Sequence, residues 1–387
     1  MDQQIYLDYN STTPCDSKVL EKMIPYFNMI FGNASSTNHS FGWKASEAIE
    51  NATNSIAKFL KVKPSEIIYT SGATESINSI LRGVCDKFNS SHIITLKTEH
   101  KATLDVCSYM EEKGVRLTYL DVDQNGIVNI NDLDAAITKE TKLVSIMYAN
   151  NETGVIQPIK EISKVCKRNN VLFFSDATQA LGKIELKKFF SYVDYACFSA
   201  HKVYGPKGIG VTFIKNSSKK FLDSYILGGG QQKNLRGGTY NVPSIVGFSE
   251  AIELFNFNFL NYIKRTTKLR NNLQKGLLKI EEVNVNCISV KRLPNTLNIS
   301  FKFVDGENLL NSLSRYIAVS NGSACNSQSV KPSHVLIAMG IPENLCFSSL
   351  RISIGKHTTE SEVDKAIQII TKEVAVIRSS NLLWKKK

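Results

Sequence analysis

The sequence predicts an α/β fold built around a mostly parallel sheet. Between about residues 65 and 215, short apolar runs alternate with longer segments of helical periodicity. The runs are continuously apolar, as expected for strands that are buried on both faces. These predicted strands are Glu66–Tyr69, His92–Leu96, Leu143–Met147, Val171–Phe174 and Tyr195–Phe198.

A different pattern follows the glycine-rich stretch at residues 228–238, and it predicts a smaller α+β region. Residues 249–280 are predicted to form a long helix and Thr296–Phe303 a strand. The last helix is predicted to begin after a capping box formed by Thr359 and Glu362. Its apolar stripe, which we expect to pack onto its own domain, consists of Val363, Ile367, Ile370, Val374 and Ile377.

The composition is that of an ordinary globular protein, with 42% hydrophobic and 21% charged residues among 387. This excludes a disordered or fibrous chain, and no apolar run approaches the ~18 residues that a membrane span requires. The 47 basic and 35 acidic residues give a net charge of +12. The lysines are scattered and no nucleic-acid-binding motif is present, so we expect neither a membrane nor a direct nucleic-acid partner.

The eight cysteines are scattered and form no C-x-x-C pair, so we expect neither a metal site nor a redox pair. Without a signal peptide, free thiols of this kind predict a reducing, cytoplasmic location, with most of them buried. The run from Asp121 to Asp132 resembles a calcium loop. The segment before it, Val115–Leu120, reads as a strand where a calcium loop needs a helix, so we interpret Asn125–Gly126 as a turn.

Chemically useful residues follow several of the predicted strands, where ligands gather in open α/β sheets. The segment Ser71–Ser76 begins a helix and is either a phosphate cradle or a simple N-cap. His100 follows the second strand, and on its own a single histidine is usually structural. Asp176 ends an apolar strand and needs a cationic partner. Lys202 lies deep enough for burial to lower its pKa, which makes its amine nucleophilic.

Together these features match what pyridoxal 5′-phosphate requires of a protein. A lysine binds the cofactor as a Schiff base, an aspartate keeps the pyridine nitrogen protonated, a histidine stacks on the ring, and a helix start holds the phosphate. The set is more specific than any of its members, and we know of no other cofactor that uses all four at successive strand ends.

The sequence resembles the cysteine desulfurases of the NifS/IscS type, which belong to the fold-type I pyridoxal-phosphate enzymes. The resemblance extends over nearly the whole chain, in ten segments that keep a fixed order: LDYNSTTP, FGNASSTNHSFGW, IIYTSGATES, TEHKATLD, NNETGVIQP, DATQALGK, SAHKVYGPKGIG, GGGQQKNLRGGT, SNGSACNS and SSLRISIG. It implies a seven-stranded sheet in a large domain, residues 16–250, and a small α+β domain made of residues 1–15 and 251–387.

The resemblance also implies residue roles. Lys202 would carry the Schiff base, Asp176 would pair with the pyridinium, and His100 would stack on the ring and shuttle protons. Arg351, together with Asn151, would bind the substrate carboxylate. The residues that would hold the phosphate, or the ring hydroxyl and its surroundings, are Ala73, Thr74, Ser199, His201, Asn151, Gln179 and, from the second subunit of a homodimer, Thr239.

Cys325 lies in the small polar run Ser320–Ser327. Alone it could be an idle thiol, but the resemblance implies that its thiolate attacks the sulfur of L-cysteine and keeps it as a persulfide, with release of L-alanine. The sulfur would pass to an iron–sulfur scaffold protein or to an acceptor for tRNA thiolation. The chain after Leu382 is shorter than the tail with which many relatives dock a scaffold, so we do not expect docking through such a tail.

Other activities on the same fold are a selenocysteine lyase, a kynureninase-like hydrolase and an aminotransferase. The cysteine-bearing loop argues against the last two, which need no such thiol. A non-catalytic sulfur carrier or basic binding protein is disfavoured, because it has no use for a Schiff-base lysine such as Lys202.

Overall fold

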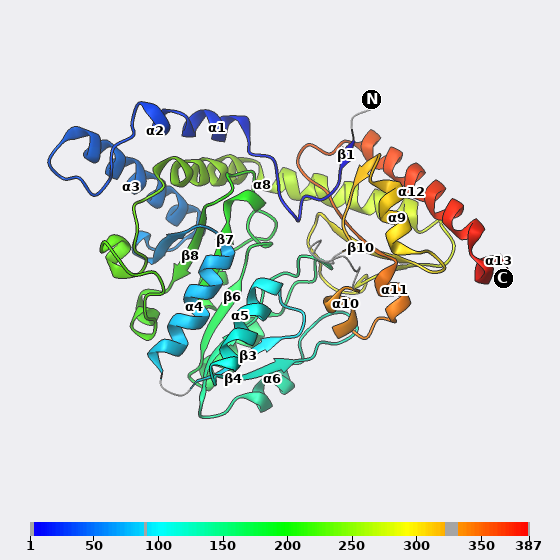
Figure 1. Cartoon of the computed structure of the whole chain (residues 1–387), viewed down its shortest axis with the longest axis horizontal. Coiled ribbons are helices and arrows are strands. Elements are labelled where there is room, and N and C mark those ends of the chain that lie inside the picture. The colour runs from blue at the N-terminus through cyan, green and yellow to red at the C-terminus, as the bar shows by residue number, and fades with distance from the viewer. Residues whose placement is uncertain (1–3, 89–90, 322–331, 386–387) are drawn as a thin grey trace.

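The computed structural model describes residues 4–88, 91–321 and 332–385, and a seven-stranded sheet forms its larger part (Figure 1). The strands lie in the order β2-β8-β7-β6-β5-β3-β4. Their bounds are β2 Ile67–Thr70, β3 His92–Leu96, β4 Arg116–Leu120, β5 Thr141–Ser145, β6 Leu172–Asp176, β7 Tyr195–Ser199 and β8 Gly210–Ile214.

The sheet is mostly parallel, as predicted. Strands β4, β3, β5, β6 and β7 run in one direction, and β8 is antiparallel to both β7 and β2. All five predicted strands are present, and the largest displacement is in β5, which ends at Ser145 instead of Met147. Beyond Ser145, the Ile146 amide still donates to the Phe174 carbonyl oxygen at 3.1 Å, although the strand has ended.

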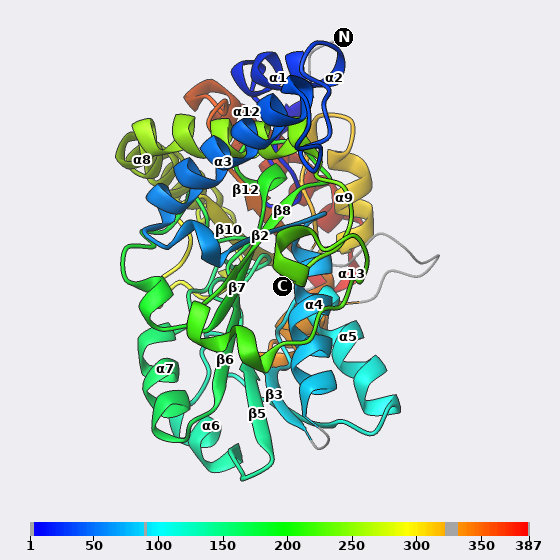
Figure 2. The same ribbon diagram turned by 90° about the vertical axis from the view of Figure 1, so that its left-hand side faces the viewer.

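Helices cover both faces of the large sheet, as the two views show (Figure 1, Figure 2). Helices α4 and α5 pack on one face and share a buried core with β3, β6 and β7. Helices α3, α6, α7 and the first part of α8 pack on the other face. The bounds are α3 Ser40–Leu60, α4 Ala73–Lys87, α5 Lys101–Glu112, α6 Ile130–Ala136, α7 Ile159–Arg168 and α8 Val242–Leu277.

A second core surrounds a three-stranded antiparallel sheet of order β12-β10-β9. Helices α9 and α12 pack against it, and near them the short strand β1 pairs in parallel with β11. The bounds are β1 Ile5–Tyr6, β9 Val283–Val285, β10 Thr296–Phe301, β11 Ile317–Ala318, β12 Ser349–Ser353, α9 Gly306–Leu313 and α12 Glu360–Ser380.

The predicted last helix is confirmed as α12. The Thr359 hydroxyl accepts from the Glu362 amide, and the Glu362 carboxylate accepts from the Thr359 amide, so the capping box is complete. Val363, Ile370 and Val374 are buried in the second core. The remaining short helices are α1 Ser17–Met23, α2 Pro25–Asn28, α10 His334–Ala338, α11 Glu343–Phe347 and α13 Leu382–Lys385.

Helix α8 links the two cores. Its first part buries Ile245 and Phe248 against the large sheet, and its second part buries Leu269 and Leu273 against the small one. The helix begins seven residues before the predicted start at 249, because Asn241 caps it by accepting from the Ser244 amide. The domain boundary expected at residue 250 falls inside this helix, and the domain division stays a prediction.

Within the described ranges, no helix is long and apolar enough to cross a membrane, and no group of three or more metal-ligating side chains is present. The calcium-like segment is a turn, as interpreted: the Asp123 carboxylate accepts from the amides of Asn125 and Ile127, and Gly126 has φ of +80°. Strand β4 precedes this turn.

Candidate active site

Lys202 lies directly after β7, in the short 3-10 turn Ala200–Lys202. Its Nζ donates to the carbonyl oxygens of Asn10 at 2.8 Å and Ser11 at 2.6 Å. Burial, together with the positive charge of Arg351, lowers the pKa of the Lys202 amine to about 8, although Asp176 and Asp8 act in the opposite direction. About a tenth of this amine is therefore neutral, and nucleophilic, at pH 7.

Asp176 is the last residue of β6, and only 8% of its surface is exposed. Its Oδ1 accepts from the Thr178 amide at 2.9 Å and from the Cys197 thiol at 3.4 Å. No side-chain cation lies within 4 Å of this carboxylate among the described residues. A buried carboxylate without a protein cation beside it suits a ligand that supplies one, such as a pyridinium nitrogen.

His100 caps the N-terminus of α5, where its Nδ1 accepts from the Ala102 amide at 3.1 Å. Burial lowers the pKa of the ring and Lys202 adds to this, although Asp176 acts in the opposite direction. The ring is therefore neutral near pH 7. Because Nδ1 is the acceptor, the ring proton is on Nε2, which can donate it.

The start of α4 lies against the end of β7. Its N-cap residue, Gly72, has no side chain with which to cap the helix, and the Ala73 amide donates instead to Ser199 Oγ of β7 at 2.8 Å. This favours a phosphate cradle over a simple side-chain N-cap. A Cβ on Gly210 would lie 2.7 Å from the Cα of Gly72, so only glycine allows β8 to approach so closely.

Two further predicted phosphate ligands lie at this edge. Thr74 is in the first turn of α4, where backbone N–H groups have no partner within the helix. His201 adjoins Lys202, and its Nδ1 bonds to Thr12 Oγ1 at 3.0 Å. Burial and the neighbouring lysines lower the pKa of His201 to about 4, so its ring is neutral and can act as a hydrogen-bond donor.

Arg351 is in β12 and is 7% exposed. Its Nη2 pairs with Asp8 at 2.8 Å, whereas its Nε is buried without a hydrogen-bond partner among the described residues. A guanidinium with one donor left over in a buried position suits a carboxylate ligand. The backbone of Arg351 also pairs with Ser320, the residue that begins the segment carrying Cys325.

Asn151 and Gln179 are joined to this group through Asn10. The Asn10 side chain donates to the Asn151 carbonyl oxygen at 3.1 Å, and Gln179 Nε2 donates to the Asn10 carbonyl oxygen at 2.8 Å. Thr239 lies apart from them: it is exposed, and no hydrogen bond within the described ranges connects it to the other predicted site residues. Cys325 lies outside the described residues.

Sequence reasoning did not single out Asn10 and Asp8. Asn10 is 1% exposed and contacts Lys202, Gln179 and Asn151 through its main chain or side chain. Both residues are in LDYNSTTP, where a run of polar residues follows an apolar one at the start of the chain. That run resembles the polar strand ends that identified the other candidates, and it could have been included with them.

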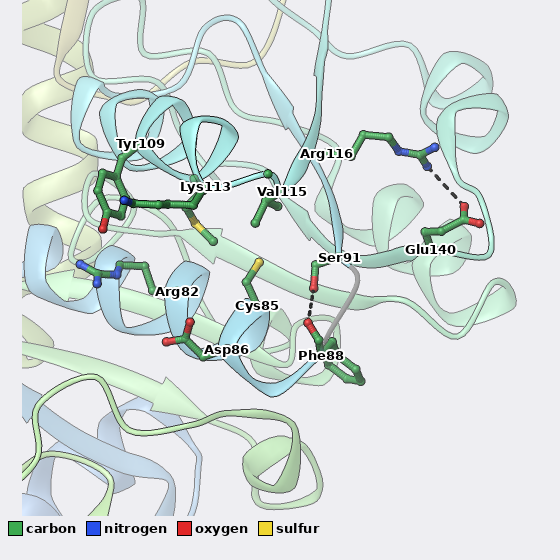
Figure 3. A pocket seen from close by; sticks show the side chains of 12 residues that line it. Arg82, Cys85, Asp86, Phe88, Ser91, Tyr109, Lys113, Val115, Arg116 and Glu140 are labelled. Atoms are coloured by element: carbon green, nitrogen blue, oxygen red, sulfur yellow. Dashed lines mark hydrogen bonds and ion pairs between the residues drawn. The ribbon is translucent and has the colours of Figure 1, made fainter.

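The structure also has a cavity of about 810 Å³ at the opposite edge of the sheet (Figure 3). Arg82 and Tyr109 from α4 and α5 lie on one side of it, and Arg116 and Glu140 lie on the other. None of the predicted site residues lines this cavity.

Comparison with known proteins agrees with this geometry. The aminotransferase class-V family matches residues 5–366. A cysteine desulfurase IscS from Buchnera aphidicola is 46% identical over 98% of this chain and 95% of its own, and one from Glaesserella parasuis is 45% identical over the same shares. Among solved structures, a NifS-like protein superposes with a TM-score of 0.89 at 40% identity, covering 97% of this chain and 100% of its own. A second NifS-like protein, from Rickettsia africae, has a TM-score of 0.86 at 32% identity and covers 96% and 100% of the two chains.

The chain therefore belongs to the class-V aminotransferases, a family of pyridoxal-phosphate enzymes. Within that family it belongs with the cysteine desulfurases of the NifS/IscS type. The residues present fit the cofactor: a partly buried amine of lowered pKa, a buried carboxylate without a cation beside it among the described residues, and a helix start with glycine at its N-cap lie at one edge of the sheet.

Proposed function

We propose that this chain converts L-cysteine to L-alanine and leaves the sulfur as a persulfide on Cys325. One observation carries the proposal: Arg351, whose Nε is free to bind a substrate carboxylate, pairs through its backbone with the first residue of the Cys325 segment. The residue that would bind the substrate and the start of the segment that carries the nucleophile thus both lie at β12. Lys202, Asp176, His100, Ala73, Thr74, Ser199, His201, Asn151 and Gln179 are proposed to hold pyridoxal phosphate, with Thr239 added from a second subunit.

Bound pyridoxal phosphate supplies an electron sink for the carbon atoms of the substrate. The protein groups supply the rest of the chemistry. Arg351 orients the carboxylate, and the neutral amine of Lys202 accepts the Cα proton. The Cys325 thiolate then attacks the substrate sulfur: an S–S bond forms, and the Cβ–S bond breaks with its electron pair remaining on the carbon. A proton donated by Nε2 of His100 completes the methyl group, and Lys202 returns its proton to Cα, so that alanine is formed.

Several finer points belong to this proposal. We assign the sulfur to an iron–sulfur scaffold protein, because the similar proteins from Buchnera aphidicola and Glaesserella parasuis are IscS enzymes. An acceptor for tRNA thiolation is the other destination that the resemblance implies. The exposed position of Thr239 supports a homodimer in which this residue serves the partner's site. A cytoplasmic location is supported by the seven free cysteines in the described ranges.

The test is a single-turnover incubation of purified protein with L-cysteine, with alanine and sulfane sulfur followed by mass spectrometry. We expect one alanine per active site, and a persulfide on Cys325 that is absent in Cys325→Ala. Cys15→Ala is the matched control, because Cys15 is a free thiol exposed at the surface. Bound cofactor without a persulfide would keep the family and reject the reaction.

A further inference from the structure

A second buried lysine lies beside the candidate active site. Lys183 is 4% exposed, and its Nζ donates to Gln179 Oε1 at 2.7 Å and faces Asn10 Oδ1 at 3.5 Å. No carboxylate lies within 4 Å of this amine among the described residues. A buried lysine without an acidic partner carries a large desolvation cost, so a purely structural role is a poor explanation for it.

The fold itself brings Lys183 to Gln179. After β6, the chain makes a tight helical turn in which the amides of Lys183 and Ile184 both donate to the Ala180 carbonyl oxygen. Gly182 has φ of +72° in this turn, and a side chain there would collide with Phe255. The turn thereby brings the Lys183 amine to the Gln179 amide oxygen, at 2.7 Å.

The orientation of the Gln179 amide is determined from both ends. The Asn10 carbonyl can only accept, so it must face the amide nitrogen of Gln179, at 2.8 Å. The Lys183 amine donates at the other end, so it faces the amide oxygen. The Asn10 amide is fixed in the same way, because its Nδ2 donates to the Asn151 carbonyl and its oxygen faces Lys183.

The Gln179 amide and Lys202 share one hydrogen-bond acceptor. Lys202 Nζ donates to the Asn10 carbonyl oxygen at 2.8 Å, the same oxygen that accepts from Gln179. Lys183, Gln179, Asn10 and Lys202 therefore form one continuous hydrogen-bonded chain that ends at the proposed Schiff-base lysine. A change at Lys183 reaches Lys202 through two hydrogen-bonded residues.

We propose that Lys183 is a positioning residue: it holds the oxygen of the Gln179 amide, so that Gln179 presents its remaining N–H, and not its oxygen, to the cofactor ring. The inference rests on the proposed function, because it assigns Gln179 to the ring hydroxyl. An N–H donor at that oxygen stabilises its ionised form. Without the donor, the ring oxygen accepts more strongly from the protonated nitrogen of the Lys202 linkage, which then keeps its proton to higher pH.

The groups that act electrostatically on Lys183 are Lys202 and Arg351, both cations. With burial, they lower the pKa of Lys183 to about 7. The amine donates to Gln179 whether it is charged or neutral, so the positioning role persists across the range in which it titrates.

The experiment is a pH titration of the visible absorbance band of the purified holoenzyme. In Lys183→Met, which has similar length and no donor, we expect the midpoint to rise by about one unit. Lys183→Gln restores a donor without the charge, and we expect its midpoint to stay close to that of the wild type. In a Gln179→Leu background, Lys183→Met should produce almost no further shift. Lys219→Met is the matched control. The Lys219 amine also donates to a single partly buried acceptor, the carbonyl oxygen of Ser65, and it takes no part in the hydrogen-bonded chain described above.

The inference is overturned if Lys183→Met titrates like the wild type, or if Lys183→Met and Lys183→Gln shift equally, which would assign the effect to charge. Should Lys183→Met not fold, Lys183→Leu takes its place as the variant without a donor, and the same rise of the midpoint relative to Lys183→Gln is expected. Failure of the proposed function is recognised separately, in wild-type protein that binds no cofactor or forms no alanine from L-cysteine.

Discussion

The two edges of the large sheet differ in a way that shows where the chemistry lies. The edge at which the parallel strands begin, called the amino edge below, has the cavity of about 810 Å³, lined by exposed or paired side chains such as Arg116 and Glu140 (Figure 3). The edge at which these strands end, the carboxyl edge, has Asp176 and a lysine of lowered pKa, and Arg351 of β12 acts on that lysine from the small sheet; Asp176 and Arg351 are both less than 9% exposed. Volume alone therefore does not indicate function here. The better indication is a buried charged group that lacks a partner among the described residues, such as the Asp176 carboxylate or Nε of Arg351.

A pair of histidines shows the same contrast. His92 begins β3, and both of its ring nitrogens bond to threonine hydroxyls, Thr141 at 2.7 Å and Thr118 at 2.8 Å. His100 follows the other end of β3 and uses only Nδ1 among the described residues. The first ring is fully engaged in structure, and the second keeps a nitrogen available for a proton transfer.

The largest expected effect comes from Lys202→Ala at the carboxyl edge. Removing the amine removes both the proposed covalent link to the cofactor and the proposed proton acceptor, so alanine formation from L-cysteine should fall by a factor of about 10³ or more. Bound cofactor is measured by absorbance after desalting. Retention of wild-type turnover would exclude Lys202 from the reaction.

Arg351→Lys should chiefly raise the KM for L-cysteine, by about 10- to 100-fold, because a lysine keeps the charge but loses the bidentate fork. Steady-state kinetics of alanine release measure this change. The Asp8 partner remains in the variant, so a KM equal to that of the wild type would mean that the substrate carboxylate binds elsewhere.

The pKa of about 8 for Lys202 predicts how fast cofactor-free protein takes up pyridoxal phosphate at different pH values. Only the neutral amine attacks the aldehyde, and this form is lost as the pH falls below the pKa. Between pH 7 and pH 9 the rate should rise about tenfold, with a midpoint near 8. Stopped-flow absorbance follows the reaction, and a flat profile would contradict the lowered pKa.

At the amino edge, His92→Gln should leave turnover unchanged and lower the free energy of unfolding by about 1–2 kcal/mol, because two buried hydrogen bonds are disturbed. Burial lowers the pKa of His92 to about 4, so the unfolded chain binds the extra proton between pH 6.5 and 4. The wild type loses stability over that window and the variant does not. The difference between them, measured by urea unfolding, should therefore shrink as the pH falls.

The smallest effect is expected for Arg116→Gln in the wall of the cavity. Its ion pair with Glu140 spans 3.5 Å and is half exposed on both sides, so the free energy of unfolding should change by less than about 0.5 kcal/mol. Turnover with L-cysteine should be unaffected. A clear loss of turnover would give the amino edge a role in the reaction and break the contrast between the two edges.

The sequence by itself determined the class of fold and most of the residues at the carboxyl edge. Apolar runs such as β3 and β7 are visible as strands because burial on both faces requires continuous hydrophobicity. Polar residues that follow such runs, Asp176 and Lys202 among them, must then share one edge of a parallel sheet. The capping box at Thr359 is likewise a local signal, and it is confirmed in α12.

Only the tertiary structure decided which partners these residues have. Asn10 and Arg351 lie near opposite ends of the chain. The main-chain carbonyl of Asn10 nevertheless accepts from Lys202, and Arg351 pairs with Asp8, because the segment after β1 pairs with β12. The hydrogen bond from Lys183 to Gln179 depends on the turn between them, in which Gly182 has a positive φ. Such contacts join distant segments and depend on packing geometry, which no local pattern of residue types records.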